Sequence, residues 1–209
     1  MIAARQIAFG RGGKRLPYDA EVEYLESTGT QYIDTGYILN TRSKLVLDVM
    51  WTAITHTTET AQQIGVVKWN DSGNYRTIFA QQMGALAAFC ADANPELSPN
   101  TYDVHTYTAD LPNKKCSISR SGSARSANIN TSLSGTFTKS FYIFARNNGG
   151  VAELYCRCKI YSFKAYDDSS LILDLIPVRK GNIGYMYDRV SGRLFGNQGT
   201  GEFIIGDDV

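Results

Sequence analysis

The chain has 209 residues and a mass of 23.1 kDa, which suffices for one domain with a substantial hydrophobic core. Lysine plus arginine number 21 and aspartate plus glutamate 20, so the net charge of +1 provides no global field to attract nucleic acid or an anionic membrane. No apolar run reaches the roughly 18 residues of a membrane span, and none follows the basic N-terminus as in a signal peptide. We therefore expect a soluble chain made in a cytoplasm, with no nucleic-acid partner and no membrane insertion.

The first fifteen residues form a basic arm rich in glycine, which interrupts any helix. Its positive charges, with no acid among them, are Arg5, Arg11, Lys14 and Arg15. Acidic residues follow directly after Leu16-Pro17, so we expect an arm over residues 1–17 and one domain over 18–209. The arm is either an anchor that orders on a larger assembly or a neighbouring subunit, or a solvated leader.

Composition favours an all-β fold. The chain contains 19 glycines and 13 tyrosines and only 20% charged residues, which indicates turns and aromatic strand positions rather than helices. Residues 44–51 alternate as a half-buried strand does, with one face formed by Leu45, Leu47, Val49 and Trp51. Residues 63–69 and 75–79 flank a polar turn, which predicts a hairpin.

The remaining segments are short and bounded by turn residues, which is typical of strands. They are 83–90, 101–110, 115–120, 141–145, 171–178, 185–188, 193–195 and 202–205, with 121–134 as a loop or an edge strand and 146–150 as a turn. A longer strand at 154–165 places on one face Leu154, Cys156, Cys158, Ile160, Ser162 and Lys164. We expect an all-β fold in which two antiparallel sheets pack face to face as a jelly-roll sandwich.

No cofactor is assigned. The four cysteines show no disulfide framework, so we expect reduced thiols, with Cys156 and Cys158 packed in the core. The histidines His56 and His105 have no metal-ligand spacing to cysteine or acid. Two acidic pairs offer too few oxygens for a calcium site, which stays possible but unassigned: Asp167-Asp168 and Asp207-Asp208.

One run of acids suggests an enzyme. Sandwich-fold glucanases carry Glu-x-Asp-x-x-Glu on one strand, with the outer carboxylates as nucleophile and acid/base. Here the run begins at Glu21, has Glu23 in place of the Asp, and ends at Glu26. It also opens the domain rather than lying inside it, so a solvated first strand is the preferred interpretation and no catalytic residue is assigned.

Two turns carry residues suited to sugars, which need aromatic faces for stacking and amides or carboxylates for hydroxyl groups. The first turn offers Trp69, Asn70, Asp71, Asn74 and Tyr75, and the second Arg146, Asn147 and Asn148. Asparagine, aspartate and glycine are also what turns need for their own backbone conformations. Carbohydrate binding and turn formation therefore both explain these positions.

Both ends of the domain resemble concanavalin A-like (LamG-like) jelly-roll proteins encoded by phages and prophages of gut bacteria. The resemblance lies in residues 22–36 (VEYLESTGTQYIDTG) and in three later stretches, 174–180 (DLIPVRK), 184–188 (GYMYD) and 191–201, and covers roughly residues 20–206. It implies the fold, and a scaffold role for the matching segments, with specificity carried by residues 40–150. We expect a first strand at 23–27 to pair with a late strand near the C-terminus.

The resemblance implies a non-enzymatic structural or surface protein of a tailed phage particle, displayed on the virion surface as a head decoration, head fibre or tail component. The arm would bind other virion proteins of the capsid or tail, the domain would bind host or mucus glycans, and the protein would form homo-oligomers. A pure decoration role without sugar binding is one alternative. A concanavalin A-like glycoside hydrolase acting on bacterial surface polysaccharide is the other.

Overall fold

The computed structural model describes residues 15–54, 61–67, 76–82, 84–98, 103–130 and 137–209, and these form a two-sheet β-sandwich without a helix. No helix with the length and apolar character of a membrane span occurs among them. The first sheet contains β1 (Ala20–Glu21), β2 (Leu25–Thr28), β4 (Ser43–Trp51), β9 (His105–Asp110), β10 (Lys115–Arg120), β11 (Ser123–Asn128), β15 (Arg157–Asp167), β16 (Ser170–Lys180), β17 (Ile183–Asp188), β18 (Leu194–Phe195) and β19 (Ile204–Ile205). The second contains β3 (Ile33–Asp34), β5 (Gln62–Val67), β6 (Arg76–Gln82), β7 (Ala85–Cys90), β8 (Glu96–Leu97), β12 (Tyr142–Ile143), β13 (Arg146–Asn148) and β14 (Val151–Glu153). The predicted fold class is confirmed.

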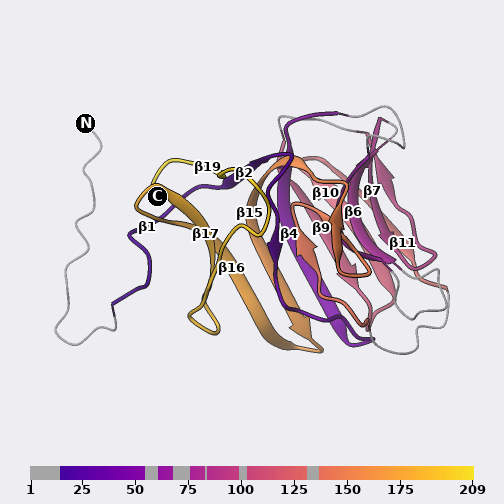
Figure 1. Cartoon of the computed structure of the whole chain (residues 1–209). Coiled ribbons are helices and arrows are strands. Elements are labelled where there is room, and N and C mark those ends of the chain that lie inside the picture. The colour runs from indigo at the N-terminus through magenta and orange to yellow at the C-terminus, as the bar shows by residue number, and fades with distance from the viewer. Residues whose placement is uncertain (1–14, 55–60, 68–75, 83, 99–102, 131–136) are drawn as a thin grey trace.

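The first sheet runs in the order β11-β10-β9-β4-β15-β16-β17-β18 and curves across the molecule (Figure 1). In β4 buried and half-buried residues alternate, as predicted, because every second side chain faces the core between the sheets. The core contains Trp51, Phe79 and Phe163, and Tyr107, whose hydroxyl accepts a hydrogen bond from Trp51 Nε1 at 3.0 Å.

The two ends of the domain meet in the first sheet, as the sequence predicts. β2 pairs with β19, so that Leu25 lies opposite Ile205, and β1 pairs with β16. The amide of Val209 also donates to the carbonyl oxygen of Glu21 at 3.1 Å. β1 and the C-terminus therefore lie together at one end of the sandwich, with β6, β7 and β11 at the other (Figure 1).

The predicted face of the long strand is wrong beyond its middle. β15 buries Cys158 and Ile160, but a bulge between Ile160 and Ser162 inserts one residue in its pairing with β4. A one-residue insertion moves all later side chains to the opposite face. Phe163 and Ala165 are therefore in the core instead of Ser162 and Lys164.

The segment 141–150 also departs from the prediction. A left-handed backbone at Phe144, with φ of 68°, ends β12 at Ile143. The expected turn at Arg146–Asn148 is a strand, β13, which pairs parallel with β5 and antiparallel with β14. The turn itself is reduced to Gly149 and Gly150, both with positive φ.

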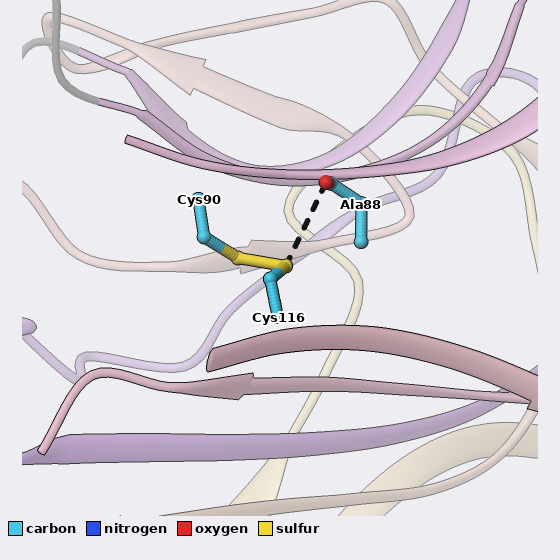
Figure 2. Close-up of a disulfide and its surroundings, with 3 residues drawn as sticks. All are labelled: Ala88, Cys90 and Cys116. Atoms are coloured by element: carbon cyan, nitrogen blue, oxygen red, sulfur yellow. Dashed lines mark hydrogen bonds between the residues drawn. A yellow bond between two sulfur atoms is a disulfide. The ribbon is translucent and has the colours of Figure 1, made fainter. Parts of the chain in front are cut away.

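The expectation of four reduced cysteines is wrong for one pair. Cys90 on β7 and Cys116 on β10 form a disulfide between the two sheets, and both side chains are fully buried (Figure 2). Cys116 Sγ also contacts the carbonyl oxygen of Ala88 at 3.6 Å. Cys156 and Cys158 are free and buried in the core, as predicted, and burial raises the pKa of Cys156.

Candidate functional site

Of the two predicted sugar-binding turns, the second lies among the described residues, in β13 beside β5. The parallel ladder places Asn148 beside Val67, the last described residue before the first turn. The residues of that turn lie outside the described residues, namely Trp69, Asn70, Asp71, Asn74 and Tyr75, and so do Arg5, Arg11 and Lys14 of the arm. Arg15, the first described residue, is exposed.

Two side chains of the second predicted turn form hydrogen bonds within the protein. Asn147 is 1% exposed, its amide nitrogen donates to the carbonyl oxygen of Ser140 at 2.9 Å, and its amide oxygen accepts the Gly150 amide at 2.7 Å. The guanidinium of Arg146 pairs with Glu153 and donates to Gln63 Oε1 at 2.8 Å. These bonds hold the β13–β14 hairpin, so Arg146 and Asn147 stabilise the fold. Asn148 is half-buried, and its side chain has no hydrogen bond to another described residue.

The two terminal motifs are tied together by a buried amide. Gln31, 2% exposed, accepts hydrogen bonds from the Thr28 amide and the Ser27 hydroxyl, both at 2.9 Å, and donates to the carbonyl oxygen of Glu202 at 3.1 Å. Buried polar groups need such partners because an unpaired one costs free energy. Gln31 therefore fixes the turn after β2 against the C-terminal segment.

Four further hydrogen bonds, two of them between backbone groups, complete this junction. Thr30 and Thr200 exchange two hydrogen bonds, the Gln198 amide donates to the carbonyl oxygen of Tyr32, and the Tyr32 amide donates to Asn197 Oδ1. A Cβ on Gly199 would lie 2.0 Å from the Thr30 carbonyl oxygen, so only glycine fits there. The predicted scaffold role of these glycine-rich motifs is thus explained at this position.

Two shallow pockets border this junction and share Gln198. One, of about 540 Å³ and here named the Phe195 pocket, is lined by Asp34, Thr35, Gly36, Tyr37, Ile172, Leu173, Asp188, Ser191, Arg193, Leu194, Phe195, Gly196 and Gln198. The other, of about 510 Å³ and here named the Tyr155 pocket, is lined by Gly29, Thr30, Tyr32, Val151, Ala152, Tyr155, Gln198, Gly199 and Thr200. We refer to the two together as the groove.

Tyr32 and Tyr155 line the Tyr155 pocket, and the buried Tyr142 packs against Tyr32. The ring of Tyr32 lies 4.9 Å from that of Tyr142 and 6.0 Å from that of Tyr155, between ring centres. Burial, followed by neighbouring acidic groups, raises the pKa of Tyr32 and Tyr142 above the ordinary value. The Tyr32 hydroxyl, like any tyrosine hydroxyl, is protonated at neutral pH and can donate a hydrogen bond to a ligand in the pocket.

The two acids of the Phe195 pocket differ in how many hydrogen bonds they already accept from the protein. Asp188 is fully buried and accepts hydrogen bonds from the Asp174, Val190 and Ser191 amides and from the Ser191 hydroxyl. Burial alone would raise the pKa of its carboxyl, but these bonds hold the pKa below the usual value. Asp34 is half-buried and accepts a hydrogen bond from the Gly36 amide alone among the described residues.

Other predicted acids lie apart from the groove. Glu21 and Glu26 belong to separate strands, and Glu26 lies 3.8 Å from Lys159 Nζ, so the Glu-rich run is not the single strand of the glucanase pattern. The acidic pairs considered for calcium hold arginines instead: Asp167 and Asp168 bind Arg42, and Asp208 binds Arg179. Among the described residues no three His, Cys, Asp or Glu side chains gather as metal ligands would.

The groove residues were not predicted, because they belong to the terminal motifs, to which only a scaffold role was assigned. Tyr32 and Asp34 alternate with the buried Ile33 in the first motif, and Gln198 belongs to the last. The signal available was this alternation, which places both polar side chains away from the core in a segment bounded by glycines. It does not reveal that the distant Tyr155 joins them.

No family model and no curated protein matches the chain. Among solved structures, a protein from Bacteroides ovatus described as a candidate carbohydrate-binding protein aligns over 90% of this chain with a TM-score of 0.56 and 12% identity. The aligned part is 61% of that longer protein, so the chain spans about three-fifths of its length. A heptameric SAP-like pentraxin from Limulus polyphemus aligns over 94% of this chain and 92% of its own, with a TM-score of 0.48 and 10% identity. The chain has a jelly-roll β-sandwich fold, similar to that of concanavalin A-like proteins.

Proposed function

We propose that the protein is a non-enzymatic carbohydrate-binding module whose ligand lies in the groove. The observation that carries the proposal is the pair of half-buried tyrosines, Tyr32 and Tyr155, that line the Tyr155 pocket beside the Phe195 pocket. Half-buried tyrosine rings offer a face to the C–H side of a sugar ring. Asp34 and Gln198 supply acceptors and donors for its hydroxyl groups.

The number of carboxyl groups free to act on a ligand favours sugar binding over hydrolysis in this groove. A glycoside hydrolase generally needs two carboxyl groups on either side of the scissile bond, about 5–9.5 Å apart. Of the two acids that line the Phe195 pocket, Asp188 accepts four hydrogen bonds, three from its own turn and one from the Asp174 amide on β16, which leaves Asp34. The Tyr155 pocket contains no acid.

Binding is expected to depend on Tyr155. In Tyr155→Ala the stacking face of its pocket is removed, and we expect affinity for any glycan identified on an array to fall at least about tenfold. The matched control is Tyr161→Ala, since Tyr161 is also half-buried and pairs edge-on with a tyrosine, Tyr24, yet lines neither pocket. Calorimetric titration with the glycan measures the affinity of both variants. Equal losses, or an array on which the wild-type protein binds nothing, would refute the proposal.

The proposal extends to a phage particle, on whose surface many copies would display this domain. Multivalency makes even weak sugar affinity useful there, because the second binding event becomes intramolecular. The support is the sequence resemblance and the basic arm, which continues from Arg15 at the end of the sandwich where both β1 and the C-terminus lie.

Deleting residues 1–15 tests this setting. We expect a truncated domain that folds with an unchanged thermal midpoint, because the first strand ladder begins at Ala20. We also expect it to be lost from purified particles, since the positive charges that would bind an acidic capsid or tail surface are gone. Mass spectrometry of particles assembled with either chain measures this. Normal incorporation of the truncated chain would place the anchor elsewhere.

A further inference from the structure

The Phe195 pocket combines a cation, an acid and an apolar wall. Arg193 is exposed and forms no ion pair among the described residues, whereas Arg189, four residues earlier, binds Asp174. The apolar wall includes Ile172, which is 40% exposed, and the half-buried Phe195. A ligand that fills this pocket therefore meets a hydrogen-bond donor, an acceptor and an apolar surface.

The position of Arg193 is set by its surroundings. Its guanidinium carbon lies 5.4 Å from the centre of the Phe195 ring, a cation–π contact, and its carbonyl oxygen accepts the Asp188 amide at 2.9 Å. A side chain held in this way loses less conformational entropy when it binds a ligand. Arg193 is therefore a pre-positioned donor.

The charge of the pocket argues against an anionic sugar. Asp34 and Asp188 outnumber Arg193 among the charged side chains that line it, so a ligand carboxylate meets net repulsion. A neutral group with both an acceptor and a donor fits better, because the acceptor can bind Arg193 and the donor Asp34.

The Tyr155 pocket differs in having no charged side chain. Its polar groups are the hydroxyls of Thr30, Thr200 and the tyrosines and the amide of Gln198. Such a surface suits an unmodified pyranose ring. Since the pockets meet at Gln198, consecutive units of one glycan can occupy both.

We propose, on the basis of the proposed function, that the ligand is an oligosaccharide containing an N-acetylated amino sugar, with its acetamido group in the Phe195 pocket. The acetamido carbonyl accepts from Arg193, the amide N–H or a ring hydroxyl donates to Asp34, and the methyl group packs on Phe195 and Ile172. The neighbouring sugar lies against the tyrosines. This assigns specificity to Arg193 and Asp34, and general sugar affinity to Tyr32 and Tyr155.

The test compares ligands that differ at one substituent. Chitotetraose, cellotetraose and the fully de-N-acetylated chitosan tetramer share a β-1,4 backbone and carry at C2 an acetamido group, a hydroxyl or an ammonium group; N-acetylgalactosamine and galactose form a second matched pair. We expect the acetylated member of at least one series to bind at least about tenfold more tightly by calorimetry. Arg193→Met should abolish that preference, while Arg125→Met, on the distant edge strand β11, should keep it.

The outcomes separate the two proposals. Equal affinity for acetylated and unacetylated ligands, a preference retained in Arg193→Met, or tighter binding of the ammonium form would overturn the acetamido inference. If Tyr155→Ala still weakens binding in those cases, the carbohydrate-binding function stands. If none of these probes binds while other glycans on the array do, the acetamido inference fails alone, and a wholly silent array removes both.

Discussion

Replacing Cys90 and Cys116 together by alanine is expected to lower the free energy of unfolding by about 3 kcal/mol. The disulfide joins β7 of one sheet to β10 of the other across a sequence separation of 26 residues, so its loss frees a long loop in the unfolded chain. Equilibrium unfolding in urea, with the free energy extrapolated to water, measures the change.

The control for this prediction is a reductant. Dithiothreitol should lower the unfolding midpoint of the wild-type protein and leave the double variant unchanged, because only the former has a bond to lose. A wild-type midpoint that is insensitive to reductant contradicts the disulfide. Since cytoplasmic thiols are kept reduced, this sandwich is expected to reach full stability only under oxidising conditions.

The variant Gly199→Ala is expected to lose about 3 kcal/mol of stability together with glycan binding. The new Cβ would lie 2.0 Å from the carbonyl oxygen of Thr30, so the backbone of the junction must separate, and the bonds between Thr30 and Thr200 lengthen. The same movement displaces Tyr32 and Gln198 on either side of the groove. Thermal unfolding and glycan titration measure the two effects.

The matched control is Gly122→Ala, in the turn between β10 and β11. Gly122 has a positive φ of 71° but no atom within 4 Å of an added Cβ, so alanine costs only the backbone strain of about 1–2 kcal/mol. Glycan affinity should be unchanged in this variant. Retention of glycan binding in Gly199→Ala would show that the junction does not shape the groove.

Local alternation predicted the strands well where one face is buried. β4 and the β5–β6 pairing were correct because a period of two residues is a direct consequence of strand geometry. The pairing of β2 with β19 was also predicted, from the presence of turn-rich motifs at both ends of the domain. The strands depend on patterns within short segments, whereas this pairing depends on motifs at the two ends of the domain.

The errors arose where tertiary contacts override local pattern. Nothing within residues 154–165 marks the bulge beside Ser162, which depends on the register with β4. Asparagine is common in turns, yet Asn147 lies buried in strand β13, where its side chain bonds to Ser140 and Gly150. To predict the disulfide between Cys90 and Cys116, one must know that two strands of different sheets face each other.

The groove contains the kinds of side chain expected of a sugar site, while the first predicted turn lies outside the described residues and stays a prediction. Aromatic, amide and acidic side chains in turns were the expected elements, and the groove contains them as Tyr32, Gln198 and Asp34. Its residues come from four distant parts of the chain, so the groove exists only after the first motif, β14, β16 and the C-terminal segment have come together. No single stretch of sequence carries that information.

The pairing of β2 also determines how the domain transmits mechanical load. β2 lies between the arm and the groove along the chain, and it is hydrogen-bonded to β15 on one edge and to β19 on the other. If the arm anchors the domain and the groove holds a glycan, as proposed, a pull between them passes through β2, and the ladders to β15 and β19 on its two edges share that force. β1 has two residues paired with β16, so it carries less of this load than β2 does.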